Sequence, residues 1–276
     1  YWQGRFVEAR RHLELCRAAY RPLHHGRHVA EFGEDAGVTS TSYAAWVLWF
    51  LGHPEQAEQS CQSALALARQ LGHPYSLAYA LTFAAVLHCR LRQPAQALVI
   101  AQEALELTEK HGFSLWQIGA TLSRGWALAL QKQHTGVELV QQCVDKVRQA
   151  MNGVSLVVLE PLAEACLEVE MFAVAGEIAV EALTLGEAIG DHHVDAELYR
   201  IRGESLLGLA AGDGAAAEAE LCFQQALMIS RGQQAKSLEL RATLSLATWW
   251  QKQGKVADAR RLLDEAHLFD CESDFH

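Results

Sequence analysis

The sequence predicts an all-α fold, an α-solenoid of about six helical hairpins stacked side by side. Three observations support this prediction. The chain has 276 residues but only 5 prolines, and it is rich in Ala, Leu, Gln and Glu, which favour helix. Apolar residues recur at helical spacing, as Ala219, Phe223 and Leu227 do. Finally, one short pattern of small and apolar residues returns about every 40 residues along the chain.

The repeated pattern is a small residue, an apolar residue four positions later and a second small residue three positions after that. Its copies begin at Ala9, Ala57, Ala97, Gly136, Ala175, Ala219 and Ala259. Chance apolar stripes would not keep a common spacing over the whole chain. Because a single hairpin cannot bury its apolar faces alone, neighbouring hairpins are expected to cover one another.

The elements follow in order as one predicted superhelical domain over residues 1–276. Residues 1–20 are predicted to be the second helix of a truncated repeat, and 21–37 an irregular connector rich in His and Gly. The hairpins are predicted at 38–70, 75–110, 115–150, 154–189, 194–231 and 235–268, before a short acidic tail, 269–276. Gly and Pro mark the turns, including the stretch from Ala211 to Gly214. Since Tyr1 falls inside a repeat, the chain is expected to be a fragment of a longer protein.

Composition excludes several classes of function. The net charge of −10 argues against binding to a nucleic-acid backbone or an anionic membrane surface. No apolar stretch is long enough to span a membrane, and no signal peptide is visible. The 7 cysteines show no paired spacing, which is typical of buried thiols in a reducing compartment, so a cytoplasmic location is expected.

Several motifs resemble known repeat proteins. Gly254 with Ala259, Leu263 and Ala266 resembles the second helix of the tetratricopeptide repeat, in a lengthened form. Longer stretches resemble the C-terminal repeat region of bacterial signalling ATPases, many of which carry a class III adenylate or guanylate cyclase domain. These stretches are 32–38 (FGEDAGV), 48–57 (LWFLGHPEQA), 124–128 (RGWAL), 196–200 (AELYR) and 234–242 (QAKSLELRA).

The resemblance implies a right-handed superhelix that serves as the sensor or regulatory arm of such an ATPase or cyclase. The fused domains are expected on the N-terminal side, because the first repeat is truncated there. This chain has no GxxxxGK[ST] loop to bind phosphate. It departs from the family pattern at Lys132 and Glu170, where a turn glycine is usual.

In these repeats the first helix of each hairpin lines a concave groove. The resemblance therefore implies these candidate binding residues: Trp46, Trp49, Tyr79, Arg90, Trp126, Glu160, Glu164, Glu197, Arg200, Glu204 and Arg241. Exposed aromatic residues beside polar ones suit the anchoring of a peptide or helix. Two alternatives stay open, namely that the tryptophans pack in the seams between repeats and that the charged residues form a self-neutralising ladder of ion pairs. Gly203 is expected to let two helices approach closely.

Other clusters of polar residues do not match a catalytic or metal-binding frame. Histidines and carboxylates gather in two places, at His24, His25, His28, Glu31, Glu34 and Asp35, and at Asp191, His192, His193 and Asp195. These residue types suit zinc, but their spacing fits no known zinc motif. Glu160, Glu164 and Glu168 share a helix face without an accompanying nucleophile or oxyanion motif. No catalytic residue, metal or cofactor is therefore predicted.

The predicted function is a non-catalytic module that binds a protein, a peptide or a small effector in its groove. A basic segment is the expected partner if the acidic wall from Glu160 to Glu204 is exposed. Nucleic acid and membrane are not expected partners. The alternatives are a scaffold for oligomerisation and a groove with small-molecule-binding or enzymatic activity.

Overall fold

The computed structural model describes residues 1–151, 155–209 and 212–272, and all the regular structure in these ranges is helical. The all-α prediction is confirmed. The helices are α1 (Phe6–Ala19), η1 (Pro22–His24), α2 (His25–Phe32), α3 (Ala36–Phe50), α4 (Pro54–Leu71), α5 (Pro74–Arg90), α6 (Pro94–His111), α7 (Ser114–Leu130), α8 (Thr135–Met151), α9 (Leu156–Glu168), α10 (Phe172–Ile189), α11 (Asp195–Gly208), α12 (Gly212–Gly232), α13 (Lys236–Lys252) and α14 (Val256–Glu272).

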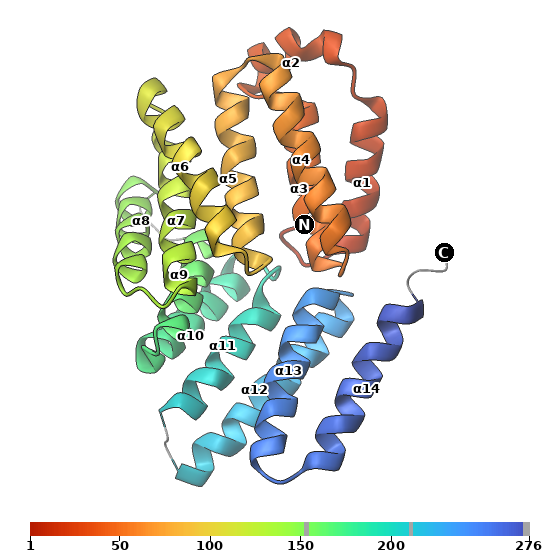
Figure 1. The fold of residues 1–276 in the computed structure, drawn as a ribbon, viewed down its shortest axis with the longest axis vertical. Helices are drawn as coiled ribbons and strands as arrows, with labels where there is room; N and C mark the ends of the chain where they lie inside the picture. The colour runs from red at the N-terminus through yellow and green to blue at the C-terminus, as the bar shows by residue number, and fades with distance from the viewer. Residues whose placement is uncertain (152–154, 210–211, 273–276) are drawn as a thin grey trace.

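From α3 onward the helices pack as sequential hairpins, as in tetratricopeptide solenoids (Figure 1). Local sequence explains where they begin and end. Pro54, Pro74 and Pro94 occupy first turns, where the missing N–H costs nothing. Second helices end at left-handed glycines such as Gly72 and Gly112, which meet no penalty from a β-carbon.

The first helices of the hairpins form an inner layer that closes on itself. Each of α3, α5, α7, α9, α11 and α13 contacts the next, and α13 contacts α3 again; we call these six helices the inner ring. Every residue from Ala78 to Arg90 of α5 and from Val158 to Cys166 of α9 is buried. The second helices, by contrast, keep one exposed face. The concave side of this solenoid is therefore filled by its own side chains.

The junction between the ends of the inner ring combines polar and aromatic contacts. Ser237 Oγ donates to the carbonyl of Trp49 at 2.5 Å. The N–H of His192 donates to the carbonyl of Trp2 at 2.8 Å, and the rings of Trp2 and His193 lie 4.9 Å apart. These contacts join residues that are far apart in the sequence, as Trp49 and Ser237 are by 188 positions.

Three segments differ from the sequence prediction. The connector 21–37 is not irregular, because it holds η1 and α2, and α3 begins at Ala36 with Asp35 as its N-cap. In the predicted turn Ala211–Gly214, Ala211 lies outside the described residues and α12 already begins at Gly212. The tail predicted from residue 269 is helical to Glu272, and 273–276 lie outside the described residues.

The apolar core forms two clusters. The larger runs from Phe6 to Leu238, and the smaller holds Phe223 and Leu246 at the C-terminal end. As the sequence predicted, Gly203 permits close packing, since a β-carbon there would lie 2.5 Å from the Phe223 ring. That residues 1–276 form one domain stays a prediction. No described helix has the length and apolar character needed to cross a bilayer.

Candidate functional site

Arg90 is a buried cation of the inner ring, enclosed by three aromatic rings. It is the last residue of α5, and its guanidinium carbon is 5.3 Å from the ring centre of Trp49, 5.1 Å from Phe50 and 5.5 Å from Trp126. A guanidinium over aromatic faces is attracted by the ring quadrupoles. The three rings restrict the orientation of the Arg90 guanidinium. In this orientation two of its N–H groups can contact one carboxylate.

That acid is Glu160 on α9. Arg90 donates through Nη1 and Nη2 to Oε1 and Oε2 of Glu160, at 3.3 and 3.1 Å. Both side chains are almost fully buried. A two-point pair between a guanidinium and a carboxylate is among the strongest protein hydrogen-bonding geometries, so this contact ties α5 to α9 across the inner ring.

Arg241 of α13 extends the charged contacts to α11. It pairs with Glu164 and also with Glu197, the latter at 3.1 Å. Glu197 in turn accepts from Arg200 one helical turn along α11, at 2.5 to 3.1 Å. Arg200 also faces Glu204 at 3.9 Å. Together with the Arg90–Glu160 pair, these contacts join the first helices of four hairpins, α5, α9, α11 and α13, by ion pairs.

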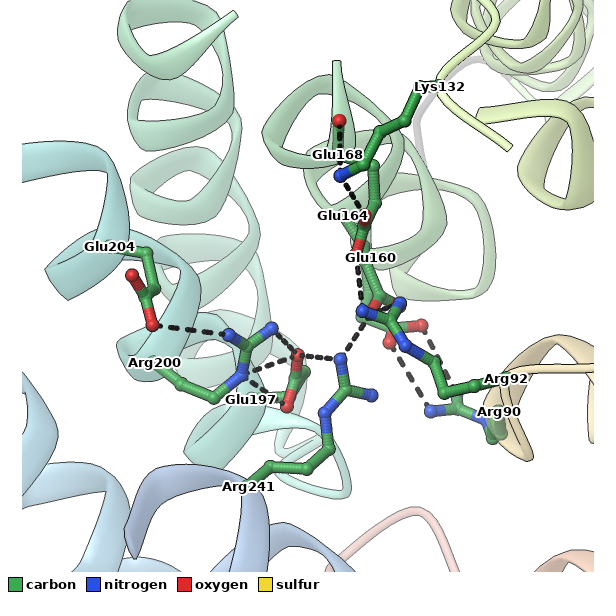
Figure 2. Close-up of polar contacts among 10 residues, drawn as sticks. All are labelled: Arg90, Arg92, Lys132, Glu160, Glu164, Glu168, Glu197, Arg200, Glu204 and Arg241. Atoms are coloured by element: carbon green, nitrogen blue, oxygen red, sulfur yellow. Dashed lines mark hydrogen bonds and ion pairs between the residues drawn. The ribbon is translucent and has the colours of Figure 1, made fainter. Parts of the chain in front are cut away.

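These ion pairs reach the surface at Arg92 and Lys132. Arg92 donates to Glu164 at 3.1 Å and to Glu168 at 2.5 Å. Lys132 donates to the Glu168 carboxylate at 2.7 Å and to its backbone carbonyl at 2.8 Å. Figure 2 shows the whole set, which we call the ion-pair network: Arg90, Arg92, Lys132, Glu160, Glu164, Glu168, Glu197, Arg200, Glu204 and Arg241.

The ion-pair network holds five acids and five bases, so it carries no net charge when all ten side chains are ionised. Burial raises the pKa of Glu160 to about 7, in spite of Arg90, and the nearby Glu164 and Glu197 add to the shift. Burial also acts to raise the pKa of Glu197, but Arg200 and Arg241 outweigh it and lower that pKa to about 2. Two carboxyls in one network thus have pKa values displaced in opposite directions.

Some buried polar atoms of the network have no hydrogen-bond partner. These are Nε of Arg90, Oε2 of Glu164 and Nη1 of Arg241. A buried group without a partner keeps its full cost of desolvation. The network is therefore not arranged for maximum stability alone, and buried ion pairs in general contribute little to stability compared with apolar packing of the same volume.

The predicted site residues are brought together in two groups. Arg90, Glu160, Glu164, Glu197, Arg200, Glu204 and Arg241 belong to the ion-pair network, and Trp49 and Trp126 flank Arg90. Trp46 and Tyr79 lie apart from them, both stacked on Phe83 with ring centres at 4.0 and 4.5 Å. Trp46 Nε1 also donates to the Phe83 carbonyl at 2.9 Å.

Most of these residues are inaccessible from solvent in this structure. The four aromatic candidates, Trp46, Trp49, Tyr79 and Trp126, are exposed by 6% or less. Glu160, Glu164 and Glu197 are exposed by 1% or less, so the condition for a basic partner, an exposed acidic wall, is not met. That these residues bind a partner stays a prediction, and contact with them requires the inner ring to open.

Sequence reasoning did not include Arg92 and Lys132 among the site residues. Both stand in the turn after a first helix, with φ of 59° and 64°, where Gly52 and Gly254 stand in other hairpins. A charged residue in a left-handed turn position is uncommon, and Lys132 was noted above as a departure from the glycine pattern. The charged residue in place of the usual turn glycine was therefore the sequence feature that could have pointed to Lys132.

The other candidate chemistry is accounted for by local contacts. His25 pairs with Asp35 at 3.0 Å, and Asp35 also accepts from Gly37 N and Val38 N at the start of α3. His193 pairs with Asp191 at 2.6 Å. Among the described residues, no group of three or more His, Cys, Asp or Glu is arranged to hold a metal ion. Glu160 has a raised pKa, and Arg90 donates to both its oxygens.

Comparison with solved structures places the fold among tetratricopeptide-like solenoids. Yeast Tom70 superimposes with a TM-score of 0.50 and 14% sequence identity, over 95% of this chain and 54% of that chain. The Signal Transduction ATPase with Numerous Domains protein with a tetratricopeptide repeat sensor from Pyrococcus horikoshii gives a TM-score of 0.47 and 17% identity, over 86% of this chain and 38% of that one. BtubC from P. vanneervenii superimposes with a TM-score of 0.39 and 17% sequence identity, over 99% of this chain and 92% of that chain.

At these identities the likeness establishes the fold alone. This chain spans 38% of the repeat-sensor ATPase and 54% of Tom70. No protein-family model and no curated protein sequence matches it.

Proposed function

We propose that this chain is a non-catalytic protein-binding module, and that an acidic segment of its partner binds at Arg92 and Lys132. The observation that carries the proposal is the difference in exposure within the ion-pair network. The side chains of Arg92 and Lys132 are exposed by 49% and 65%, whereas their partner Glu168 is exposed by 11%. Around Glu168, the accessible charges of the network are therefore the two bases.

Arg92 and Lys132 can bind a further carboxylate while they keep their hydrogen bonds to Glu168. A guanidinium carries five N–H donors and an ammonium three, more than the bonds that these two groups make to Glu164 and Glu168. Because the turns after α5 and α7 are neighbours, one short acidic segment can reach both bases. The chain as a whole carries a charge of −10, so recognition must come from local pairing and not from long-range attraction.

The test uses two matched double variants. Arg92→Ala with Lys132→Ala removes the proposed contact, and Arg69→Ala with Arg148→Ala removes two bases of comparable exposure that pair with Glu103 and Glu181 on second helices. Peptides selected from a random display library on the wild-type chain are expected to be rich in Asp and Glu. They should bind the second variant normally and the first at least about tenfold more weakly.

Two outcomes would contradict the proposal. One is a library that yields no peptide above background, and the other is an equal loss of binding in both double variants. Circular dichroism of each variant confirms that helicity is retained.

We further propose that the module regulates a signalling ATPase or nucleotide cyclase. The support is the sequence resemblance of stretches such as 48–57 and 234–242. Determining the coding sequence that flanks this chain in its gene tests the idea directly. A phosphate-binding loop or a cyclase domain in the same reading frame is expected, and a complete reading frame without either would refute it.

A scaffold function has one observation in its favour. Leu240 and Leu244 on α13 and Val256 on α14 are exposed by 47%, 49% and 57%, and an apolar face on the last hairpin suits self-association. Light scattering over a range of concentrations tests this. A mass that rises with concentration in the wild type but not in Leu244→Lys supports a scaffold, and a constant monomer mass contradicts it.

A further inference from the structure

The helix α2 lies at one end of α1 and α3 (Figure 1). Residues of these three helices line a cleft outside the inner ring. Its volume is about 580 Å³, which falls in the usual range for small-molecule sites. α1 contributes Leu13 and Ala19, α2 contributes Phe32, and α3 contributes Thr39 and Tyr43. The cleft shares no residue with the ion-pair network.

The walls of the cleft are mainly apolar and incompletely covered. α2 has no buried residue, and Phe6 is the one buried residue of α1. Phe32 leaves 63% of its surface exposed although its ring is large and apolar. A bound apolar group would remove this surface from water, which is favourable in proportion to the area covered.

One carboxylate, Glu34, stands at the edge of this apolar surface. Thr39 Oγ1 donates to it at 3.1 Å. Among the described residues that line the cleft, the one basic side chain is His28, which lies 3.6 Å from Asp35. Burial raises the pKa of Glu34 above its ordinary value, with Thr39 acting against the shift. A cation brought next to this carboxylate would favour its ionised form.

The neighbouring Asp35 does not compete for such a cation. It accepts from Gly37 N and Val38 N at 2.9 and 3.0 Å, from Tyr20 Oη at 3.2 Å, and pairs with His25. The Asp35 carboxylate thus caps the N-terminus of α3 and pairs with His25 of α2. Glu34 is the carboxylate that remains for a ligand.

We propose that this cleft binds a small apolar amine, with the apolar part between Leu13, Phe32 and Tyr43 and the ammonium paired with Glu34. An alcohol of the same length would gain the apolar contact without the ion pair. A fatty acid would bring a second negative charge beside Glu34, which is unfavourable. We therefore expect the amine to bind most tightly, the alcohol more weakly and the fatty acid most weakly.

Isothermal titration with octylamine, octanol and octanoate tests this order. At neutral pH, octylamine is expected to bind with a stoichiometry of one and at least about tenfold more tightly than octanol. Glu34→Gln should reduce the octylamine affinity to that of octanol. The matched control is Glu31→Gln, which removes an exposed acid of α2 paired with Arg27 and should leave the affinity unchanged.

A second variant tests the apolar part independently. Leu13→Trp is expected to fill the cleft and to abolish the binding of amine and alcohol alike, while circular dichroism shows whether the fold is retained. If Leu13→Trp does not fold, the comparison between Glu34→Gln and Glu31→Gln decides alone.

The proposal is overturned if octylamine and octanol bind equally, if neither binds, or if the two glutamate variants behave alike. Its failure is distinguishable from failure of the proposed protein-binding function. The variant Arg92→Ala with Lys132→Ala should bind octylamine as the wild type does.

Discussion

Arg90 and Glu160 are 70 positions apart in the sequence, yet they form a two-point ion pair at 3.1 and 3.3 Å inside the inner ring. The contact is possible because the hairpins turn far enough to bring α5 and α9 together. Three aromatic rings hold the guanidinium in place. The concave side, which is expected to be an open groove in a solenoid of this kind, is thereby occupied by paired charges.

Removing the Arg90 guanidinium should destabilise the fold strongly. Arg90→Met keeps an apolar side chain among the aromatic rings but leaves the buried Glu160 without its donors, and a loss of about 3 kcal/mol or more is expected in urea unfolding. Adding Glu160→Met should restore most of this loss. Arg69→Met, which breaks an exposed pair with Glu103, should cost less than about 1 kcal/mol. Similar losses for Arg90→Met and Arg69→Met would show that the buried pair has no special role.

Stability should depend on pH through Glu160. The folded-state pKa of about 7 lies above the ordinary value of 4.5, so folding retains a proton that the unfolded chain releases over this interval. The resulting stabilisation is complete below pH 4.5 and is lost as the pH rises through about 7. Between these limits the free energy of unfolding should fall by about 1–3 kcal/mol more in the wild type than in Glu160→Gln.

The control for this pH dependence is Glu181→Gln, which changes an exposed acid paired with Arg148. It should show the wild-type slope. Parallel slopes for the wild type and Glu160→Gln would mean that Glu160 is ionised normally in the folded protein.

Gly203 should not tolerate even a methyl group. A β-carbon at this position would lie 2.5 Å from Cε1 of Phe223, so Gly203→Ala is expected to destabilise by about 1–3 kcal/mol. Adding Phe223→Leu should make the combined loss smaller than the sum of the two separate losses. In contrast, Gly26→Ala on α2 meets no atom within 4 Å and should be neutral or stabilise by about 0.5–1 kcal/mol. A neutral Gly203→Ala, measured by thermal unfolding, would contradict the close packing of α11 and α12.

Glu170 occupies a left-handed turn position with φ of 63°, as Lys132 does with φ of 64°. Because Glu170 is exposed, Glu170→Gly should relieve backbone strain and stabilise by a few tenths to about 1 kcal/mol. Lys132→Gly relieves the same strain but loses the bonds to Glu168, so it should stabilise less or destabilise. If both variants gain equally in the free energy of unfolding, the Lys132 contact contributes nothing to stability.

The sequence alone determined the number, order and type of the helices from α3 onward. Helical periodicity and the small residues at Ala57, Ala97 and Ala175 are local features, and the structure buries all three side chains completely. The turn predicted from the glycines at Ala211–Gly214 differs from the structure. Gly212 begins α12, because a glycine near a helix N-terminus is compatible with the helix as well as with a turn.

Only the tertiary structure decided whether the inward residues of the first helices face solvent. Their positions on the helices follow from the repeat, but their exposure depends on how far each hairpin rotates relative to the last. That rotation accumulates until α13 meets α3 and Arg241 reaches Glu164, 77 positions earlier in the chain. No local pattern encodes the accumulated angle. For this physical reason the sequence predicted which residues of the first helices point inward, and only the structure shows that Arg241 and Glu164 meet there.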